Sequence, residues 1–515
     1  MMKIQSILKI GFVLLLLSLV FSGCNRDNRY DSCAHEYMSE IIKSPTCTEC
    51  GEAEYTCIFC GNTYITSVPT TEHSYNAWWT VDQEPNCTYE GIKSYHCSMC
   101  DARTEVTVME KQRVHNVVEG ACEYCGVEDS TPGLHFFEQN DGTYQLTGIG
   151  TCTENDIVVG IYNNRDVTLI APSAFAGNCD ILSVDIQAQI DIIYDGSFEW
   201  CENLVSLRLN EGLMQIGSNA FRGCLSLESI HIPSSVTRIS NNNAFSICTS
   251  LKSITVGKEN SVYCAVDGNL YSKDGEILVK YALGKSDNIF TVPPGVKRIE
   301  DCAFMYARNL VTLVVSDGVI EVGGGVSYCE NLTEIILPNT LRFFGGQLLE
   351  CDNVVYSEHH GGLYLGNSEN PYLVLVDRTP GAAVTAVHPN AKILGSGFGF
   401  FEEDNISGEA IPYGVLTVSC YFSNCDWLTE LVIPDSVTQI SSPGRMGLVR
   451  DCDNLTEIVI PESVALITGY ISVGCDNLSV IYCVAEEQPS AWDLNWNNDA
   501  VPVEWGCAGK QNNSR

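Results

Sequence analysis

The amino-acid sequence predicts a repeat solenoid, mostly strand and loop, with a parallel β-sheet on one face and small Cys/His-rich modules in front of it. Three observations predict this fold. An apolar leucine position recurs at intervals that include 22, 23 and 24 residues, a proline often ends the apolar run, and Cys-x-x-Cys pairs recur near the amino terminus. A fixed period of this length is typical of a solenoid, because one coil must stack on its neighbours to bury its apolar face.

The composition bounds the class of partner. The chain has 515 residues, with 64 Asp and Glu against 28 Lys and Arg, and a formal net charge of −36. We expect no nucleic-acid partner, because binding to a polyphosphate depends mainly on Lys and Arg that release counterions. Hydrophobic residues make up 45% of the chain, which is enough for a packed core.

Residues 1–23 have the three parts of an export signal. Two lysines precede the apolar run at 10–21, and small residues follow it. The run is shorter than the roughly 20 residues that a membrane-spanning helix needs. The sequence Phe21-Ser22-Gly23-Cys24 resembles a bacterial lipobox, which implies cleavage before Cys24 and a lipid on its sulfur. We therefore expect an extracytoplasmic protein that is lipid-anchored to the bacterial membrane, with plain secretion as the alternative.

Residues 24–130 form a tandem of short Cys/His units. The markers of the first unit, an outlying cysteine, a glycine and a Cys-x-x-Cys pair, recur in the second at a shift of 40 residues. Tetrahedral zinc takes four thiolate or imidazole donors, so this pattern favours structural zinc. We expect one Cys3His site from His35, Cys47, Cys57 and Cys60, and a second from His73, Cys87, Cys97 and Cys100. A shortened third copy contains His115, Cys122 and Cys125, with Cys33 as a candidate fourth ligand.

Two alternatives to these sites remain open. Each histidine can belong to the preceding unit instead, or the thiols of an exported chain can form disulfides. The role is structural in every case, because a closed four-ligand site keeps no open position for a substrate. The segment resembles the zinc-ribbon-like modules found beside repeat domains in bacterial surface proteins.

Residues 131–172 are expected to form lead-in strands, 173–483 the repeats with insertions near 257–300 and 355–415, and 484–515 a cap and tail. In the repeat at 455–460, Ile458 and Ile460 alternate with outward-facing residues, as a short strand requires. Pro461 ends that strand because it lacks a backbone donor. The first insertion contains Val266-Asp267-Gly268-Asn269, which predicts a hairpin.

Many of the other cysteines occupy one repeat position, three residues before the leucine. They are Cys179, Cys201, Cys224, Cys248, Cys329, Cys351, Cys425, Cys452 and Cys475. Equivalent residues on stacked coils lie about 4.8 Å apart, slightly wider than the Cβ separation that a disulfide prefers. We therefore interpret these residues as small buried hydrophobic side chains.

The full repeat, Ala-Phe-x-x-Cys-x-x-Leu-x-x-Ile-x-Ile-Pro-x-x-Val-x-x-Ile, resembles the BspA-like leucine-rich repeat family over some 370 residues. The stretch at 144–150 resembles the lead-in strand of that family, and 488–505 resembles its terminal cap. The resemblance implies a leucine-rich repeat stack and a role in adhesion, because members are similar to surface proteins that attach to matrix proteins or to other cells.

One outward-facing column of the predicted sheet changes character along the stack. Its early members are polar, whereas four later members are apolar and β-branched: Val314, Ile336, Val432 and Val459. Exposed apolar stripes often mark interaction surfaces, so we expect these four to bind a partner. The alternatives are that β-branched residues simply favour strands, or that an inserted segment covers them.

The sequence predicts a cell-surface binding protein with a protein or glycan partner. It contains no Gly-x-Ser-x-Gly, His-Glu-x-x-His or complete phosphate-binding loop, so we expect neither an enzyme nor a catalytic cofactor. The alternatives are a structural spacer of the cell envelope and an accessory protein that captures polysaccharide. A purified repeat domain retains affinity for one partner if the protein is a binder, and shows none if it is a spacer.

Overall fold

The computed structural model describes residues 35–513 except 241–242, 347, 407–408 and 443–446. The predicted export signal, Cys24 and Cys33 therefore lie outside the described residues. The chain divides into two compact units, residues 1–112 and 113–515, so the third Cys/His copy belongs to the same unit as the repeats. The sequence placed this division after residue 130. None of the helices in the described ranges has the length and apolar character needed to cross a membrane.

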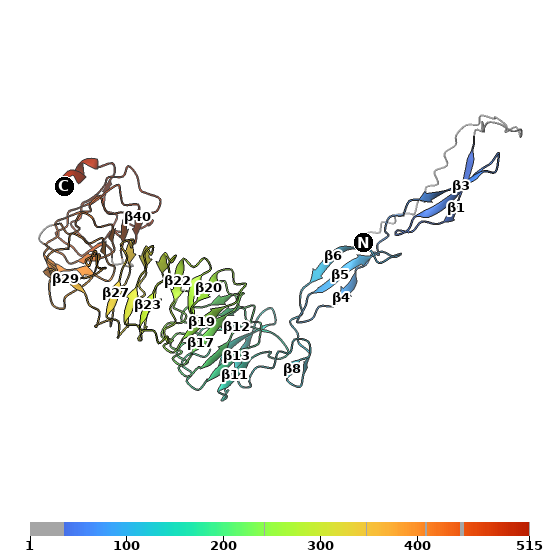
Figure 1. The fold of residues 1–515 in the computed structure, drawn as a ribbon, viewed down its shortest axis with the longest axis horizontal. Coiled ribbons are helices and arrows are strands. Elements are labelled where there is room, and N and C mark those ends of the chain that lie inside the picture. Colours follow the sequence, from blue (N-terminus) through green and yellow to red (C-terminus); the bar gives the residue numbers. More distant parts are fainter. Residues whose placement is uncertain (1–34, 241–242, 347, 407–408, 443–446, 514–515) are drawn as a thin grey trace. The chain divides into compact units, whose positions relative to one another are not determined.

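The first unit contains two three-stranded antiparallel sheets, which we call the first module (35–68) and the second module (73–109) (Figure 1). The first module has β1 (Tyr37–Lys43), β2 (Gly51–Cys57) and β3 (Thr63–Val68), and the second has β4 (Thr80–Gln83), β5 (Gly91–His96) and β6 (Arg103–Met109). Most side chains of β1 and β3 are exposed. A sheet with so little core needs another source of stability, such as a metal site.

The second unit begins with the small hairpin β7 (Val117–Val118) and β8 (Ala121–Cys122), and then forms the predicted solenoid (Figure 1). Most coils contribute two short strands that pair in parallel with those of neighbouring coils. In β17 the side chains of Ile230 and Ile232 are buried, while those of Ser229 and His231, which alternate with them, are exposed. Ile230 pairs in register with Ile254 of the next coil. The alternation predicted from the sequence is therefore present, and the fold class is confirmed.

Most repeats have one strand before the position of the proline and a second strand after it. We call the stacked strands before this position the first column and the stacked strands after it the second column. The first column comprises β11 (Asp156–Val159), β13 (Ser183–Ile186), β15 (Ser206–Arg208), β17 (Ser229–Ile232), β19 (Ser253–Val256), β23 (Ile289–Thr291), β25 (Thr312–Val314), β27 (Glu334–Ile336), β36 (Glu430–Val432), β39 (Glu457–Ile460), β42 (Val480–Cys483) and, at its end, β43 (Val503–Glu504). The second comprises β12 (Val167–Ile170), β14 (Ile192–Ile193), β16 (Gln215–Ile216), β18 (Arg238–Ile239), β24 (Arg298–Ile299), β26 (Glu321–Val322), β28 (Phe343–Phe344), β32 (Ile393–Leu394), β34 (Thr417–Val418), β37 (Gln439–Ser441) and β40 (Leu466–Thr468). The second column was not predicted from the sequence.

Antiparallel strands join the second column at the lead-in and at both insertions. They are β9 (His135–Glu138) with β10 (Tyr144–Gly148), β20 (Tyr263–Val266) with β21 (Asn269–Ser272) and β22 (Ile277–Lys280), and β29 (Ser357–His359) with β30 (Gly362–Leu365) and β31 (Val374–Arg378). The predicted hairpin is confirmed, because Val266 pairs with Asn269. Asp267 and Gly268 between them both have positive φ, at 49° and 76°, as a tight two-residue turn needs.

The last coils add a third parallel sheet and a short carboxyl-terminal helix. The sheet consists of β33 (Gly399–Phe400), β35 (Tyr421–Ser423), β38 (Val449–Arg450) and β41 (Ser472–Val473). Two 3-10 turns are described in this part of the chain, η2 (Glu402–Asp404) and η3 (Ala508–Asn513). The second insertion and the tail therefore both add structure around the last repeats.

The repeated cysteines are buried, except Cys179, which is exposed, and three of them contact residues of a stack of phenylalanine rings. The thiols of Cys201, Cys224 and Cys248 donate to the backbone oxygens of Phe175, Phe198 and Phe221, at 3.1, 3.3 and 3.1 Å. Burial raises the pKa of Cys201 and of Cys248 to about 12, so both are neutral donors. A thiol thus packs like a small apolar group and also satisfies a carbonyl of the previous coil.

Candidate functional site

The three Cys-x-x-Cys pairs share one turn. The backbone N–H of the first cysteine donates to the carbonyl five residues later, from Cys57 to Asn62, from Cys97 to Ala102 and from Cys122 to Val127, each at 2.9 Å. Gly61 and Gly126 continue the first and third of these turns with φ of 72° and 71°, a conformation that glycine adopts without strain. The turn holds both sulfurs on the same side of the backbone, as a metal-binding knuckle requires.

Three groups of possible metal ligands result, each with its ligand atoms within 4.8 Å of one another. In the first module, Nδ1 of His35 lies 3.3 Å from the sulfurs of both Cys57 and Cys60. In the second unit, Nδ1 of His115 lies 3.4 Å from the sulfur of Cys125, and Cys122 lies beside them. These arrangements can hold a metal ion.

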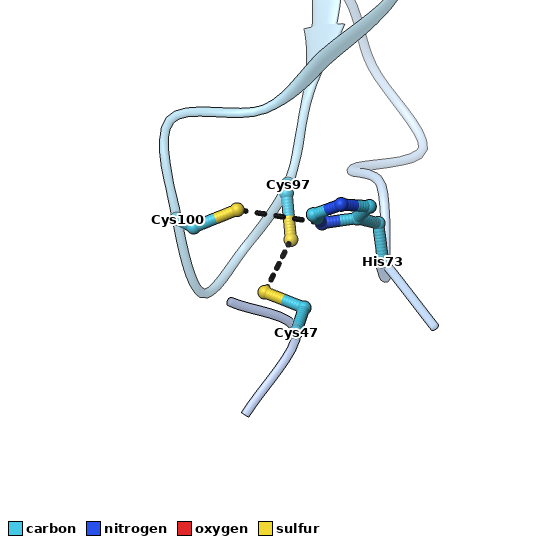
Figure 2. Close-up of side chains that lie close together, drawn as sticks. All are labelled: Cys47, His73, Cys97 and Cys100. Atoms are coloured by element: carbon cyan, nitrogen blue, oxygen red, sulfur yellow. Dashed lines mark hydrogen bonds between the residues drawn. The ribbon is translucent and has the colours of Figure 1, made fainter. Parts of the chain in front are cut away.

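The group in Figure 2 has four possible ligands, Cys47, His73, Cys97 and Cys100. The sulfurs of Cys47 and Cys97 are 3.7 Å apart, and Nδ1 of His73 is 3.4 Å from the sulfur of Cys100. Cys97 is buried, whereas Cys47 and Cys100 are half-buried and His73 is exposed. All four side chains point toward a common centre (Figure 2).

The predicted grouping of Cys47 with His35, Cys57 and Cys60 is wrong. Cys47 lies in the loop before β2 and Cys57 lies at the end of β2, a strand of seven residues. At 3.3 Å per residue the two cysteines are roughly 20 Å apart, at opposite ends of the module. The six residues of β5 separate Cys87 from Cys97 in the same way. The alternative in which each histidine joins the preceding unit is also wrong, because His73 lies beside Cys100, in the unit that follows it.

The local electrostatics favour the thiolate form of the first cysteine in two of the knuckles. The backbone N–H of Met99 and then the His73 ring outweigh the effect of burial and lower the pKa of Cys97 to about 6. Burial acts against ionisation of Cys57, but the N–H of Cys60 and the His35 ring outweigh it and lower the pKa of Cys57 to about 6. The first cysteine of each of these knuckles is therefore readily a thiolate, the form that binds metals.

Asp166 contacts a histidine of the third group of possible ligands, and the sequence analysis did not identify it. Its carboxylate accepts a hydrogen bond from Nε2 of His115 at 2.7 Å, and Nδ1 of the same ring faces Cys125. A carboxylate in this position fixes the histidine tautomer and orients the ring toward a metal. No sequence signal links the two, because they are 51 residues apart.

The predicted apolar stripe is only partly exposed. Val314, Ile336 and Val432 are half-buried, and Val459 is 1% exposed, so the expectation that Val459 faces solvent is wrong. Its strand neighbour Glu457 and its register partner Tyr482 both contact Lys510 of η3. The carboxyl-terminal segment therefore covers this part of the column.

Two hollows lie where stripe residues face the flanking segments. One, of about 610 Å³, is lined by Ile336, Val355 and Gly366 among others. The other, of about 390 Å³, we call the Lys510 groove; its lining includes Trp427, Glu430, Val432, Glu457, Val459 and Lys510. Nζ of Lys510 lies 3.0 and 3.2 Å from the two carboxylate oxygens of Glu457 and 4.0 Å from the centre of the Tyr482 ring.

Comparisons with known proteins find leucine-rich repeat and surface proteins among the similar solved structures. Among solved structures, the pneumococcal vaccine antigen PcpA is 17% identical, with 83% of this chain and 93% of that one covered and a TM-score of 0.34. A leucine-rich repeat protein from Bacteroides ovatus is 19% identical, with 72% and 98% covered and a TM-score of 0.31. A leucine-rich cell surface protein from Faecalibacterium prausnitzii is 20% identical, with 68% and 93% covered and a TM-score of 0.28.

No curated protein matches the chain. The model of the BspA type leucine-rich repeat region matches in six copies, over residues 168–265, 280–359 and 397–487. These ranges make up more than half of the chain and coincide with the coils described above. The chain therefore belongs to the BspA-type leucine-rich repeat family.

Proposed function

We propose that the protein is a cell-surface binding protein whose solenoid takes up a basic segment of a protein partner in the Lys510 groove. The observation that carries this proposal is the lysine that the chain itself places there. Lys510 pairs with Glu457 and lies over the Tyr482 ring, as a partner's lysine or arginine would.

The chemistry of the groove fits a cationic side chain. Three carboxylates line it, from Glu409, Glu430 and Glu457, and Lys510 is the one cation among its described lining residues. Trp427 and Val432 supply apolar walls for the aliphatic stem of a lysine or arginine. The side chain of Lys510 is 40% exposed, and an exposed ion pair contributes only about 0–1 kcal/mol. A partner can therefore displace it.

Replacing both Glu430 and Glu457 with glutamine is expected to weaken partner binding at least about tenfold, because a hydrogen bond to a charged group contributes about 1.5–3 kcal/mol. The measurement is binding of the full chain to immobilised matrix proteins and glycans at low and high salt. The matched control is Glu228→Gln, which breaks an exposed Glu–Lys pair outside the groove. Lys510→Ala should strengthen binding.

A protein ligand whose binding is weakened by salt and by the double substitution supports this proposal. Binding that survives the double substitution would show that the groove is not the contact. Binding to glycans alone would replace the protein partner by a polysaccharide.

We also propose that Cys24 carries a lipid anchor, supported by the signal-like sequence before it. The intact chain should partition into the detergent phase on extraction. Cys24→Ala should move it to the aqueous phase, whereas Cys33→Ala should leave it in detergent. A Cys24→Ala chain that stays with the membrane would contradict the anchor.

For the Cys/His groups we propose zinc as the metal, in a structural role. Four ligands around zinc, with Zn–S near 2.3 Å and Zn–N near 2.05 Å, place two sulfurs about 3.8 Å apart and a sulfur and a nitrogen about 3.6 Å apart. The spacings of 3.7 Å between Cys47 and Cys97 and 3.4 Å between Cys100 and His73 are close to those edges. A disulfide instead requires about 2.05 Å between sulfurs.

A further inference from the structure

We infer that Cys47 belongs to the metal site of the module that follows it, so that metal binding joins the two modules of the first unit. This inference rests on the proposal that the Cys/His groups bind zinc. It assigns a coupling role to the metal, beyond the stabilisation of each module by itself.

The topology of the first module separates its ligands into two ends. The histidine and the knuckle lie at one end of the sheet, because Tyr37 of β1 pairs with Cys57 of β2. The outlying cysteine lies in the β1–β2 loop at the other end, where Lys43 pairs with Glu52. A module built this way cannot complete its own four-ligand site. Its outlying thiol is available only to a neighbour.

A backbone contact brings the outlying cysteine to the next histidine. The N–H of Thr71, two residues before His73, donates to the carbonyl of Thr46 at 3.0 Å, directly before Cys47. The second module repeats this contact, since the N–H of Gln112 donates to the carbonyl of Asn86, the residue before Cys87, at 3.1 Å. The same loop therefore holds the outgoing chain in both modules.

The shape that the two loops share depends on glycine at the end of each loop. A Cβ atom on Gly51 would lie 2.5 Å from the carbonyl oxygen of Lys43, and one on Gly91 would lie 2.7 Å from that of Gln83. Glycine at both positions allows the two sides of the loop to approach closely. Both modules therefore have the same loop, and this loop fixes the position of the outlying cysteine.

The site that results has three donors from the second module and one from the first (Figure 2). His73, Cys97 and Cys100 alone leave one tetrahedral position open, and the thiolate of Cys47 closes it. Since a closed site binds structural zinc more firmly than an open one, loss of Cys47 should release the metal from the second module and leave the first module's His35, Cys57 and Cys60 unchanged.

The test measures zinc in the full purified chain after dialysis against a mild chelator. Cys47→Ser and Cys97→Ser should each lose about one zinc equivalent relative to the wild type, and the double variant should lose no more than either single one. Cys50→Ser is the matched control, because Cys50 is three residues away and outside the ligand groups of the described chain. It should lose none. Cys47→His, which restores a donor, should recover the metal.

Each outcome decides the matter. A double variant that loses two equivalents would place Cys47 in another site and overturn the inference, while zinc itself stays established. A Cys47→Ser chain that keeps as much zinc as the wild type would also overturn the inference. A wild-type chain without zinc would overturn the zinc proposal and the inference with it. Cobalt substitution gives a second measurement, since the thiolate-to-metal absorption of the second module's site should be lost in Cys47→Ser and kept in Cys50→Ser.

Discussion

Replacing Phe221 with alanine is expected to destabilise the surrounding coils by about 3–5 kcal/mol. The ring is 0% exposed. It stacks between those of Phe198 and Phe245, with centroid separations of 5.5 and 5.6 Å. Alanine leaves a cavity lined by the rings of Phe198 and Phe245. The coils cannot close this cavity without shifting their strands.

Hydrogen exchange measured along the chain checks this prediction, because a solenoid loses stability near the change first. Amides of β15 and β17 should lose protection, whereas those of β39 should keep it. Phe221→Leu should cost less, since leucine refills most of the space. The control Tyr413→Ala removes a ring that is 64% exposed and should have little effect. Equal loss of protection along the whole solenoid would contradict the local character expected here.

Replacing Asp404 with alanine is expected to cost about 3–5 kcal/mol, as is typical when one partner of a buried ion pair is removed. The side chain is 0% exposed and accepts two hydrogen bonds from Arg378, both at 2.9 Å. It also accepts from the backbone N–H groups of Val384 and Phe401, each at 2.7 Å. Alanine would leave a mostly buried guanidinium and two amides without these partners.

The matched control for this prediction is Glu403→Ala. Glu403 pairs with the same Arg378 at 3.3 Å, but its side chain is 62% exposed, so its loss should cost no more than about 1 kcal/mol. Thermal unfolding and proteolysis of the second insertion provide the measurement. The double change Arg378→Met with Asp404→Leu should recover part of the stability. If Asp404→Ala and Glu403→Ala lowered the stability equally, burial of the carboxylate would not be the cause of the loss.

These two residues illustrate what the second insertion adds to the repeats. Arg378 ends β31 within the insertion, and Asp404 is the last residue of η2, before the next regular coil. Their ion pair joins two parts of the inserted segment, β31 and η2. The hollow near Ile336 and the Lys510 groove both depend on such added segments, which explains why half-buried stripe residues line cavities instead of a flat exposed face.

The sequence by itself determined the solenoid, the strand alternation and the buried cysteine position. These features depend on contacts between equivalent residues of adjacent coils, so a residue such as Ile230 and its partner Ile254 repeat visibly along the chain. The residues that could ligate a metal were also visible, because a Cys-x-x-Cys turn is local. Periodicity and short spacing are properties of the sequence itself, and they carry this information without any knowledge of the tertiary structure.

Only the tertiary structure decided which ligands meet and what covers the outward column. Cys47 is closer in sequence to Cys57 than to Cys97, yet a strand of seven residues separates it from the former while the chain folds back to bring it 3.7 Å from the latter. Lys510 reaches Glu457 from 53 residues away, and Asp166 reaches His115 from 51. Such contacts do not repeat and have no local pattern. Their geometry is set by strand direction and by the path of the connecting loops.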